Sequence, residues 1–581
     1  MSDEADFPMT GEGDIKISDS FIRSLQECEE LCRSLCISES CSQMMKTKED
    51  GVRSTAGGFV LAVGDETTIR RFIILGTSSG TYYSREKQLT MDNVNALINI
   101  IERGRGSLIL KEIHEVSRAG RNPKQDPLLF ALALCARYNV CDTIRKLSRN
   151  KEALERGHVA AAKLKYLREL HKSAFEIVND VCRIPAHLFT FVKYCEMVSQ
   201  STQLESGKKS TGWGRLMRGA IQRWYASKSP GQLAMHLTKY PQRDGWSHRD
   251  LFRLAHPKLK VSIFSPTILE YKQLYHFAVK DVEQPTKKYR AVQMDTELNS
   301  RALDLVEAVM ALKNEKDEAK VVAAIKKHRL VREQIPADML SSVAVWQALL
   351  DGMPMTAMIR NLGKMQSIGV LTDSFRASVI ARLTSEEELK RAKIHPVHVL
   401  MAKTAYESGH GGIGELSWKA NEEINGALEV AFYKSFINAP PTNKRYCFAF
   451  GRLWKSISGA VLSCQCASAS VALSLVSMKN EKIYGATDCA LPMLWAKENN
   501  KKFDVFVVYK DNEISFRDVH PYQALRDYRE SSGIVDAKLV VMGMTAADFT
   551  IADPEDAGML DIVGFDSAVP ALLNEFVTGK I

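Results

Sequence analysis

The chain has 581 residues, 45% of them hydrophobic, and a formal net charge of +9. These values are typical of a soluble globular protein of several domains. No run of about 18 apolar residues occurs, so we expect no transmembrane helix. The first residues, MSDEADFPMTGEGD, are acidic and polar, unlike a secretion signal. We therefore expect a cytoplasmic protein, with the nucleus as an additional location, and reduced cysteines.

Residues 1–55 are predicted to be a polar N-terminal tail. Cys28, Cys32 and Cys36 lie four residues apart, which places them on one face of a helix, and Cys41 follows. Zinc sites usually have a second matching pair of ligands, so a stripe of small apolar side chains is favoured over zinc here. The cysteines expected in the core are Cys135, Cys182, Cys195, Cys447 and Cys489.

Residues 56–442 are predicted to be helical. In MDNVNALINIIERGRG, for example, Val94, Leu97, Ile98 and Ile101 recur with helical spacing, and Gly104 ends the helix. Many helices joined by short polar turns indicate an α-solenoid of helix pairs. The lysine-rich residues 142–173 are predicted to be an insertion, either one long exposed helix or a helical hairpin.

Residues 443–581 are predicted to form an α/β domain. The linker APPTNK precedes RYCFAF, FDVFVVY and AKLVVMGM, which are short apolar runs separated by helical segments. Such runs are typical of parallel strands that are buried on both faces. This arrangement indicates a doubly wound, Rossmann-like sheet.

The positive charge is concentrated in one window of the chain. Residues 206–260 contain 12 Lys or Arg residues against two Asp residues, so the whole positive excess lies in this window. A solvated helix face usually mixes both signs of charge, whereas this window does not. The window therefore indicates a surface that binds a polyanion.

The chain resembles the Ro autoantigen family, whose members combine a TROVE module with a von Willebrand factor type A module. The resemblance depends on ordered segments that span roughly residues 70–581, among them TKYPQRDGWSHRDLFRLAH, IRNLGKM, KIHPVHVLMA and GMTAADFTIADPEDAGMLDIVGFD. It implies a ring of HEAT-like helical repeats closed by the α/β domain, which looks shortened in this chain. It also implies an RNA-binding protein of small cytoplasmic ribonucleoproteins that acts in RNA stabilisation and quality control.

The resemblance also implies binding sites and partners. Family members bind Y-type noncoding RNA on the outer face of the ring and the 3′ ends of misfolded RNA in its hole. Lys239, Arg243 and His256 fall at positions where the family contacts Y RNA. The protein itself is expected to be a monomer within the ribonucleoprotein, with possible protein partners on the C-terminal domain and no membrane association.

Residue chemistry adds further candidates within the basic window. Arg249 and Arg253 are four residues apart, which places both on one helix face, where they are expected to contact phosphate. Arg215, Arg218 and His248 complete the predicted set, with His248 as a hydrogen-bond donor to phosphate. Trp246 has two interpretations, as a stacking surface for an exposed base or, more favoured, as a packing anchor.

The resemblance implies a divalent cation site at the strand ends of the α/β domain, built from a D-x-S-x-S motif, a Thr and an Asp. The segment RYCFAFGRLWKSIS has Gly451 or Trp454 where the first Asp is expected. Because Mg²⁺ prefers carboxylate oxygens, the loss of this Asp predicts weak or absent binding, with Thr487 and Asp511 as vestigial ligands.

The sequence favours two other functional classes, an enzyme and a protein-interaction scaffold, less than an RNA-binding protein. No P-loop or strand-linked GxGxxG motif occurs, so the sequence does not indicate an enzyme. A helical-repeat protein-interaction scaffold without specific RNA is the main alternative. The concentrated positive charge argues against a scaffold as the sole function.

Overall fold

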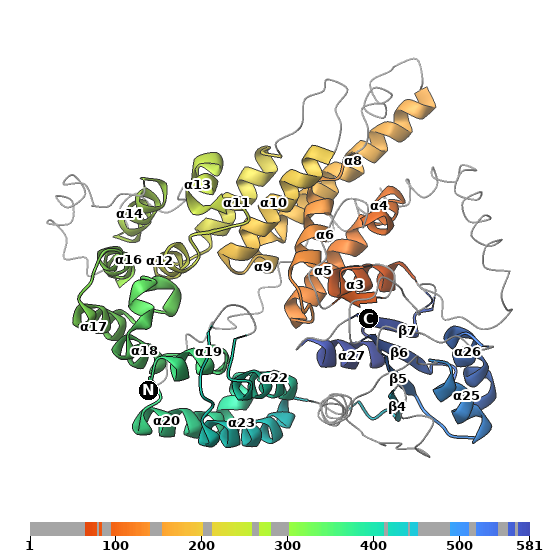
Figure 1. The fold of residues 1–581 in the computed structure, drawn as a ribbon. Helices are drawn as coiled ribbons and strands as arrows, with labels where there is room; N and C mark the ends of the chain where they lie inside the picture. The colour runs from red at the N-terminus through yellow and green to blue at the C-terminus, as the bar shows by residue number, and fades with distance from the viewer. Residues whose placement is uncertain are drawn as a thin grey trace.

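The computed structural model describes residues 64–77, 81–83, 94–139, 154–201, 212–257, 266–280, 301–411, 416–439, 442–450, 489–510, 519–543, 553, 556–563 and 568–581. Helices follow one another round an arc, and a parallel sheet lies between the two ends of that arc (Figure 1). The predicted helical-repeat ring followed by an α/β domain is therefore confirmed. The predicted tail, with its Cys28–Cys41 cluster, lies outside the described residues.

The first half of the arc contains α3 (Asp65–Leu75), α4 (Asn95–Glu102), α5 (Gly106–Ala119), α6 (Asp126–Arg137), α8 (Leu154–Glu176), α9 (Val178–Val181), α10 (Pro185–Ser201), α11 (Arg215–Ala226), α12 (Pro230–Lys239), α13 (His248–Ala255) and α14 (Pro266–Lys280). The second half contains α16 (Arg301–Leu312), α17 (Glu318–His328), η2 (Arg332–Gln334), η3 (Asp338–Ser341), α18 (Val343–Leu350), α19 (Met355–Ser367), α20 (Asp373–Leu383), α21 (Glu386–Arg391), α22 (Pro396–Glu407), α23 (Glu422–Lys434) and η4 (Ser435–Asn438).

Burial along the helices follows their sequence periodicity. In α5, Ile109, Ile113 and Val116 are buried at helical spacing, and the helix ends at Gly120 with a φ of 64°. Every residue of α6 from Pro127 to Ala136 is buried. A helix that is apolar on all sides must be surrounded, and α6 packs against α3, α5, α8 and α10.

The described part of the predicted insertion belongs to one long helix, α8, which continues beyond it to Glu176. Its first described turns begin at Leu154, and residues 142–153 lie outside the described part of the chain. Tyr166, Leu170 and Phe175 are buried against neighbouring helices, whereas Lys165 and Lys172 are exposed. The helix is therefore amphipathic rather than wholly exposed.

The C-terminal sheet is fully parallel, with the strand order β1-β7-β6-β5-β4. Its strands are β1 (Thr81–Tyr83), β4 (Tyr446–Phe450), β5 (Val505–Lys510), β6 (Lys538–Gly543) and β7 (Met559–Val563). Along β5, Val505 and Val507 face one core cluster with α27 (Val569–Val577), whereas Phe506 and Val508 face another with α25 (Leu491–Glu498) and α26 (Pro521–Ser532). Burial on both faces explains the unbroken apolar runs.

An unexpected strand joins the sheet to the beginning of the arc. β1 pairs in parallel with β7, with Tyr82 opposite Ile562, although the two strands are far apart in the sequence. The sheet is thus not built from residues 443–581 alone. The region predicted to be shortened, between Gly451 and Asp488, lies outside the described residues.

Two smaller expectations concern the burial of cysteines and the presence of membrane-spanning helices. The five cysteines predicted for the core are all buried. Across the described ranges, no helix combines the length and apolar character needed to cross a bilayer.

Candidate nucleic-acid interface

Two capped helices and a hairpin form the middle of the basic window. α12 begins with a capping box between Ser229 and Gln232, with Pro230 at its first position. It leads into the hairpin of β2 (Gln242–Arg243) and β3 (Trp246–Ser247). Asp244 and Gly245 form the turn with φ values of 55° and 80°, which suit a tight two-residue hairpin loop.

A second capping box starts α13 directly after the hairpin. The Asp250 carboxylate accepts hydrogen bonds from the Ser247 N–H (3.0 Å) and hydroxyl (2.5 Å). Leu251, Phe252 and Ala255 form the buried face of the helix, which leaves Arg249 and Arg253 on its exposed face.

Asp244 anchors the hairpin on α10. Its carboxylate accepts a hydrogen bond from the Thr190 hydroxyl (2.5 Å) and contacts the Lys193 ammonium (3.3 Å) and the Arg243 Nε (3.6 Å). Partial burial alone would raise the pKa of Asp244, but the bonds from Thr190 and Lys193 and the charge of Arg243 lower it overall. Asp244 and Asp250, the two acids of the basic window, therefore both have structural partners.

A side-chain contact from Gln222 joins α11 to the end of α13. Arg215, Arg218 and Gln222 lie on one face of α11 at helical spacing, and both arginines are exposed. The Gln222 side-chain amide donates to the carbonyls of Ala255 (2.6 Å) and His256 (3.3 Å) at the end of α13. The exposed faces of the two helices therefore join at this contact.

Seven predicted residues lie on this surface, which we call the basic face: Arg215, Arg218, Lys239, Arg243, Arg249, Arg253 and His256. The Arg243 side chain is 53% exposed, and the Lys239 ammonium lies 5.4 Å from the Tyr240 ring centroid. Across the described residues, no ion pair involves the four arginines of α11 and α13 that belong to the basic face. Their charges are available to a polyanion.

The prediction for His248 as a phosphate donor is wrong. Its side chain is in the core, at 4% exposure, with Nδ1 2.7 Å from the Tyr225 hydroxyl and Nε2 3.3 Å from the His236 carbonyl. Burial lowers the pKa of His248 to about 3, although the hydrogen bond to the His236 carbonyl acts in the opposite direction. The ring is neutral at pH 7 and almost fully enclosed, so it does not offer a phosphate donor at the surface.

Some cations of the window have internal partners, and one surface cation lies outside it. Arg223 donates to the Phe175 carbonyl (3.1 Å), and the Lys228 ammonium lies 4.6 Å from the Trp224 ring centroid. Sequence reasoning missed Lys193 of α10, whose side chain is 47% exposed beside Asp244. Its polar position within the apolar run HLFTFVKYC was the available signal.

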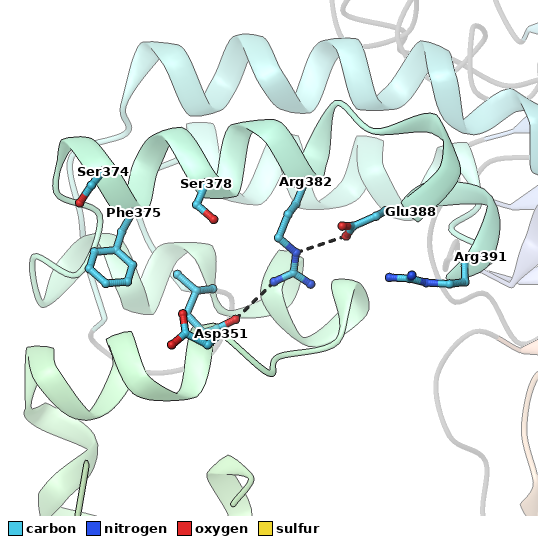
Figure 2. Close-up of a pocket in the computed structure, with 8 residues that line it drawn as sticks. Asp351, Ser374, Phe375, Ser378, Arg382, Glu388 and Arg391 are labelled. Atoms are coloured by element: carbon cyan, nitrogen blue, oxygen red, sulfur yellow. Dashed lines mark hydrogen bonds and ion pairs between the residues drawn. The ribbon is translucent and has the colours of Figure 1, made fainter. Parts of the chain in front are cut away.

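A separate hollow of about 460 Å³ lies among α18, α20 and α21 (Figure 2). The Arg382 guanidinium contacts the Glu388 carboxylate (3.2 Å) and donates to the carbonyls of Leu350 (3.3 Å) and Met353 (2.7 Å). Figure 2 shows this guanidinium between Glu388 and the end of α18. Because these bonds satisfy the cation, it closes the end of α18 rather than offering a free anion site.

Thr487 and Asp511, the predicted vestigial metal ligands, lie outside the described residues. Within the described ranges, no three His, Cys, Asp or Glu side chains come together in a way that could hold a metal ion. Weak or absent Mg²⁺ binding therefore stays a prediction, which calorimetric titration of the full chain would test; micromolar affinity would contradict it.

The fold and the basic face define a two-module protein in which a helical-repeat arc with exposed cations is joined to a parallel α/β unit. The TROVE domain model matches residues 52–408, and the Ro60 vWA domain model matches residues 456–577. The chain belongs to the Ro60 family, as its sequence predicted.

Individual relatives agree over almost the whole chain. RNA-binding protein RO60 of Caenorhabditis elegans is 46% identical and covers 93% of this chain and 92% of the relative. RNA-binding protein RO60 of Deinococcus radiodurans is 30% identical, with coverages of 93% and 97%. The crystal structure of the Deinococcus radiodurans RO (RSR) protein matches with a TM-score of 0.70 and 28% identity, over 89% of this chain and 100% of that chain.

Proposed function

We propose that this protein binds folded RNA through the basic face. The observation that supports this proposal most strongly is the set of exposed arginines on α11 and α13. These arginines have no acidic partner among the described residues. Cations of this kind neutralise phosphates and release counterions. A-form RNA hides its major-groove base edges, so a surface built from exposed cations suits recognition of its backbone and shape.

The ligand in this proposal is a Y-type small noncoding RNA, with the 3′ ends of misfolded RNA as a second ligand in the hole of the ring. The protein would then act in RNA stabilisation and quality control within a small cytoplasmic ribonucleoprotein. Family membership and the printed name of the relatives, RNA-binding protein RO60, support this proposal. Sequencing of RNA crosslinked to the protein in cells would identify the ligands, and the absence of small structured RNA would contradict it.

A double substitution tests the basic face directly. Replacing Lys239 and Arg243 by Ala is expected to weaken binding of a Y-type RNA by more than about tenfold, because two phosphate contacts are lost. The matched control is K501A/K502A, which removes the same charge from exposed lysines before β5. Fluorescence anisotropy would measure the dissociation constant of each variant. Equal dissociation constants for the two variants would contradict the proposal.

A further inference from the structure

Two tryptophans beside the basic face differ from Trp224, Trp346 and Trp418 in the environment of their indole N–H groups. Trp213, just before α11, and Trp246 of β3 are both half-buried, with ring centroids 5.5 Å apart at 48°. Buried indole N–H groups usually find an acceptor. In this protein Trp224 donates to the Cys182 carbonyl, and Trp346 and Trp418 donate to backbone carbonyls at 2.8 and 2.9 Å.

The N–H groups of Trp213 and Trp246 have no such acceptor in the part of the chain that the structure describes. Neither nitrogen is among the buried polar atoms that lack a partner, so both reach solvent. The pair therefore presents an apolar surface together with two free donors.

Two cations lie near Trp246. Arg243 lies directly opposite Trp246 across the hairpin, and Lys193 contacts the neighbouring Asp244. Trp213 is held next to α10 by Gly212, where an added Cβ would lie only 3.0 Å from the Ser199 hydroxyl oxygen. An aromatic surface flanked by cations is the arrangement with which proteins bind single-stranded nucleotides.

We propose that Trp213 and Trp246 bind one unpaired nucleobase of an RNA whose helical part lies on the basic face. This inference rests on the proposed function and adds a requirement for an unpaired base. Paired bases in an A-form helix are covered on both faces by their neighbours, so only an unpaired nucleotide can place its face on an aromatic ring. With the base stacked on one indole, the N–H of the other indole would donate to the edge of that base, and Arg243 and Lys193 would neutralise its phosphates.

The test compares three RNA hairpins with the full chain: one fully paired, one with a single unpaired adenine, and one with an abasic nucleotide at that position. Wild-type protein is expected to bind the adenine hairpin at least about fivefold more tightly than the paired hairpin. The adenine hairpin is also expected to quench tryptophan fluorescence more than the abasic one.

Substitutions test whether the two tryptophans cause the adenine preference and the fluorescence quenching. Trp213→Phe and Trp246→Phe are expected to reduce the adenine preference and the quenching while leaving the affinity for the paired hairpin unchanged. Trp418→Phe, whose indole is bonded within the helical arc, is expected to retain both. The abasic comparison leaves the protein unaltered, so it decides the matter even if a Phe variant does not fold.

The contrary outcomes are distinguishable. Equal affinity of the wild type for all three hairpins, or equal weakening of all three by the Phe variants, would overturn the nucleobase site while the proposed function stands. Failure of every hairpin to bind, even in dilute salt, would overturn the proposed function and the nucleobase site together.

Discussion

His248 shows how one residue supports a surface that it does not join. Its ring lies 5.0 Å from that of Phe189 and bonds Tyr225, so it connects α13 to α10 and α11. His236, stacked on Trp224, is also partly buried, and desolvation lowers the pKa of His236 to about 4. The basic face therefore lies over a layer of neutral aromatic and imidazole rings.

Because this layer contains buried neutral histidines, we expect the free energy of unfolding to fall in acid. Because the pKa of His248 falls from 6.5 to about 3 on folding, the unfolded chain binds more protons between those values. The associated stability is present above about pH 6.5 and declines as pH falls, by about 1.4 kcal/mol per pH unit for this group. Urea unfolding of the wild type at pH 7, 6 and 5 would measure the decline.

A substitution tests the assignment to His248. His248→Gln is expected to unfold at lower urea at pH 7 but to show a shallower decline with acidity, because one titrating group is absent. His410→Gln, at an exposed position, is the control and is expected to match the wild type. Parallel declines in all three proteins would show that His248 is not responsible.

Sequence reasoning found the exposed arginines but placed His248 on the wrong side of its helix. A count of charges does not take account of where each residue lies around a helix. His248 lies on the same side of α13 as the buried residues Leu251, Phe252 and Ala255. Attention to that spacing would have corrected the prediction. Lys193 lies on a different helix from the basic window, and only the tertiary contact with Asp244 brings it to the surface in question.

At the scale of elements, local sequence determines the shape of the basic face. The tight turn at Asp244 and Gly245 leads into the Ser247–Asp250 capping box, so hairpin and helix form one continuous unit. The position of Arg249 in the first turn of α13 depends on that cap. Loss of this cap should therefore lower both the stability of the protein and its affinity for RNA.

Ser247→Ala is expected to lower the free energy of unfolding by about 1 kcal/mol and to weaken RNA binding severalfold. The matched control is Ser342→Ala, because Ser342 accepts a hydrogen bond from the Val345 N–H (3.2 Å) and caps α18. The control is expected to lose similar stability but to keep its RNA affinity. Equal RNA affinities for the two variants, measured by anisotropy, would refute the link between this cap and binding.

The three predicted strands of the C-terminal module were confirmed, since β4, β5 and β6 coincide with the three apolar runs. β1 and β7 were missed. β1 has only three residues, and its partner lies at the other end of the chain, so no local pattern marks it as a strand. Pairing at such sequence separation depends on tertiary structure rather than on propensity.

At the scale of the whole molecule, the closure of the arc depends on buried polar contacts as well as on β1. Arg71 of α3 is buried and donates to the carbonyls of Asp556 (2.9 Å) and Met559 (3.3 Å). The Asp556 carboxylate is bound in turn by the buried Arg529 (2.5 Å). One face of the sheet shares its apolar core with α3, so the two modules are not independent units.

Arg71→Met is therefore expected to lower stability by about 2–4 kcal/mol, because two buried carbonyls lose a charged donor. Lys111→Met, at an exposed position on α5, is the control and is expected to change stability by less than about 0.5 kcal/mol. Urea unfolding monitored by circular dichroism would measure both. If the two variants unfold at the same urea concentration, Arg71 does not hold the arc closed.

The central claim is that the basic face contacts RNA, and lysine footprinting tests it most directly. The full chain would be acetylated briefly with and without a Y-type RNA, and each lysine would be quantified by mass spectrometry. RNA is predicted to protect Lys239 and Lys193 strongly while leaving the exposed Lys501 and Lys502 unchanged. Equal reactivity of Lys239 in free and RNA-bound protein would contradict the account.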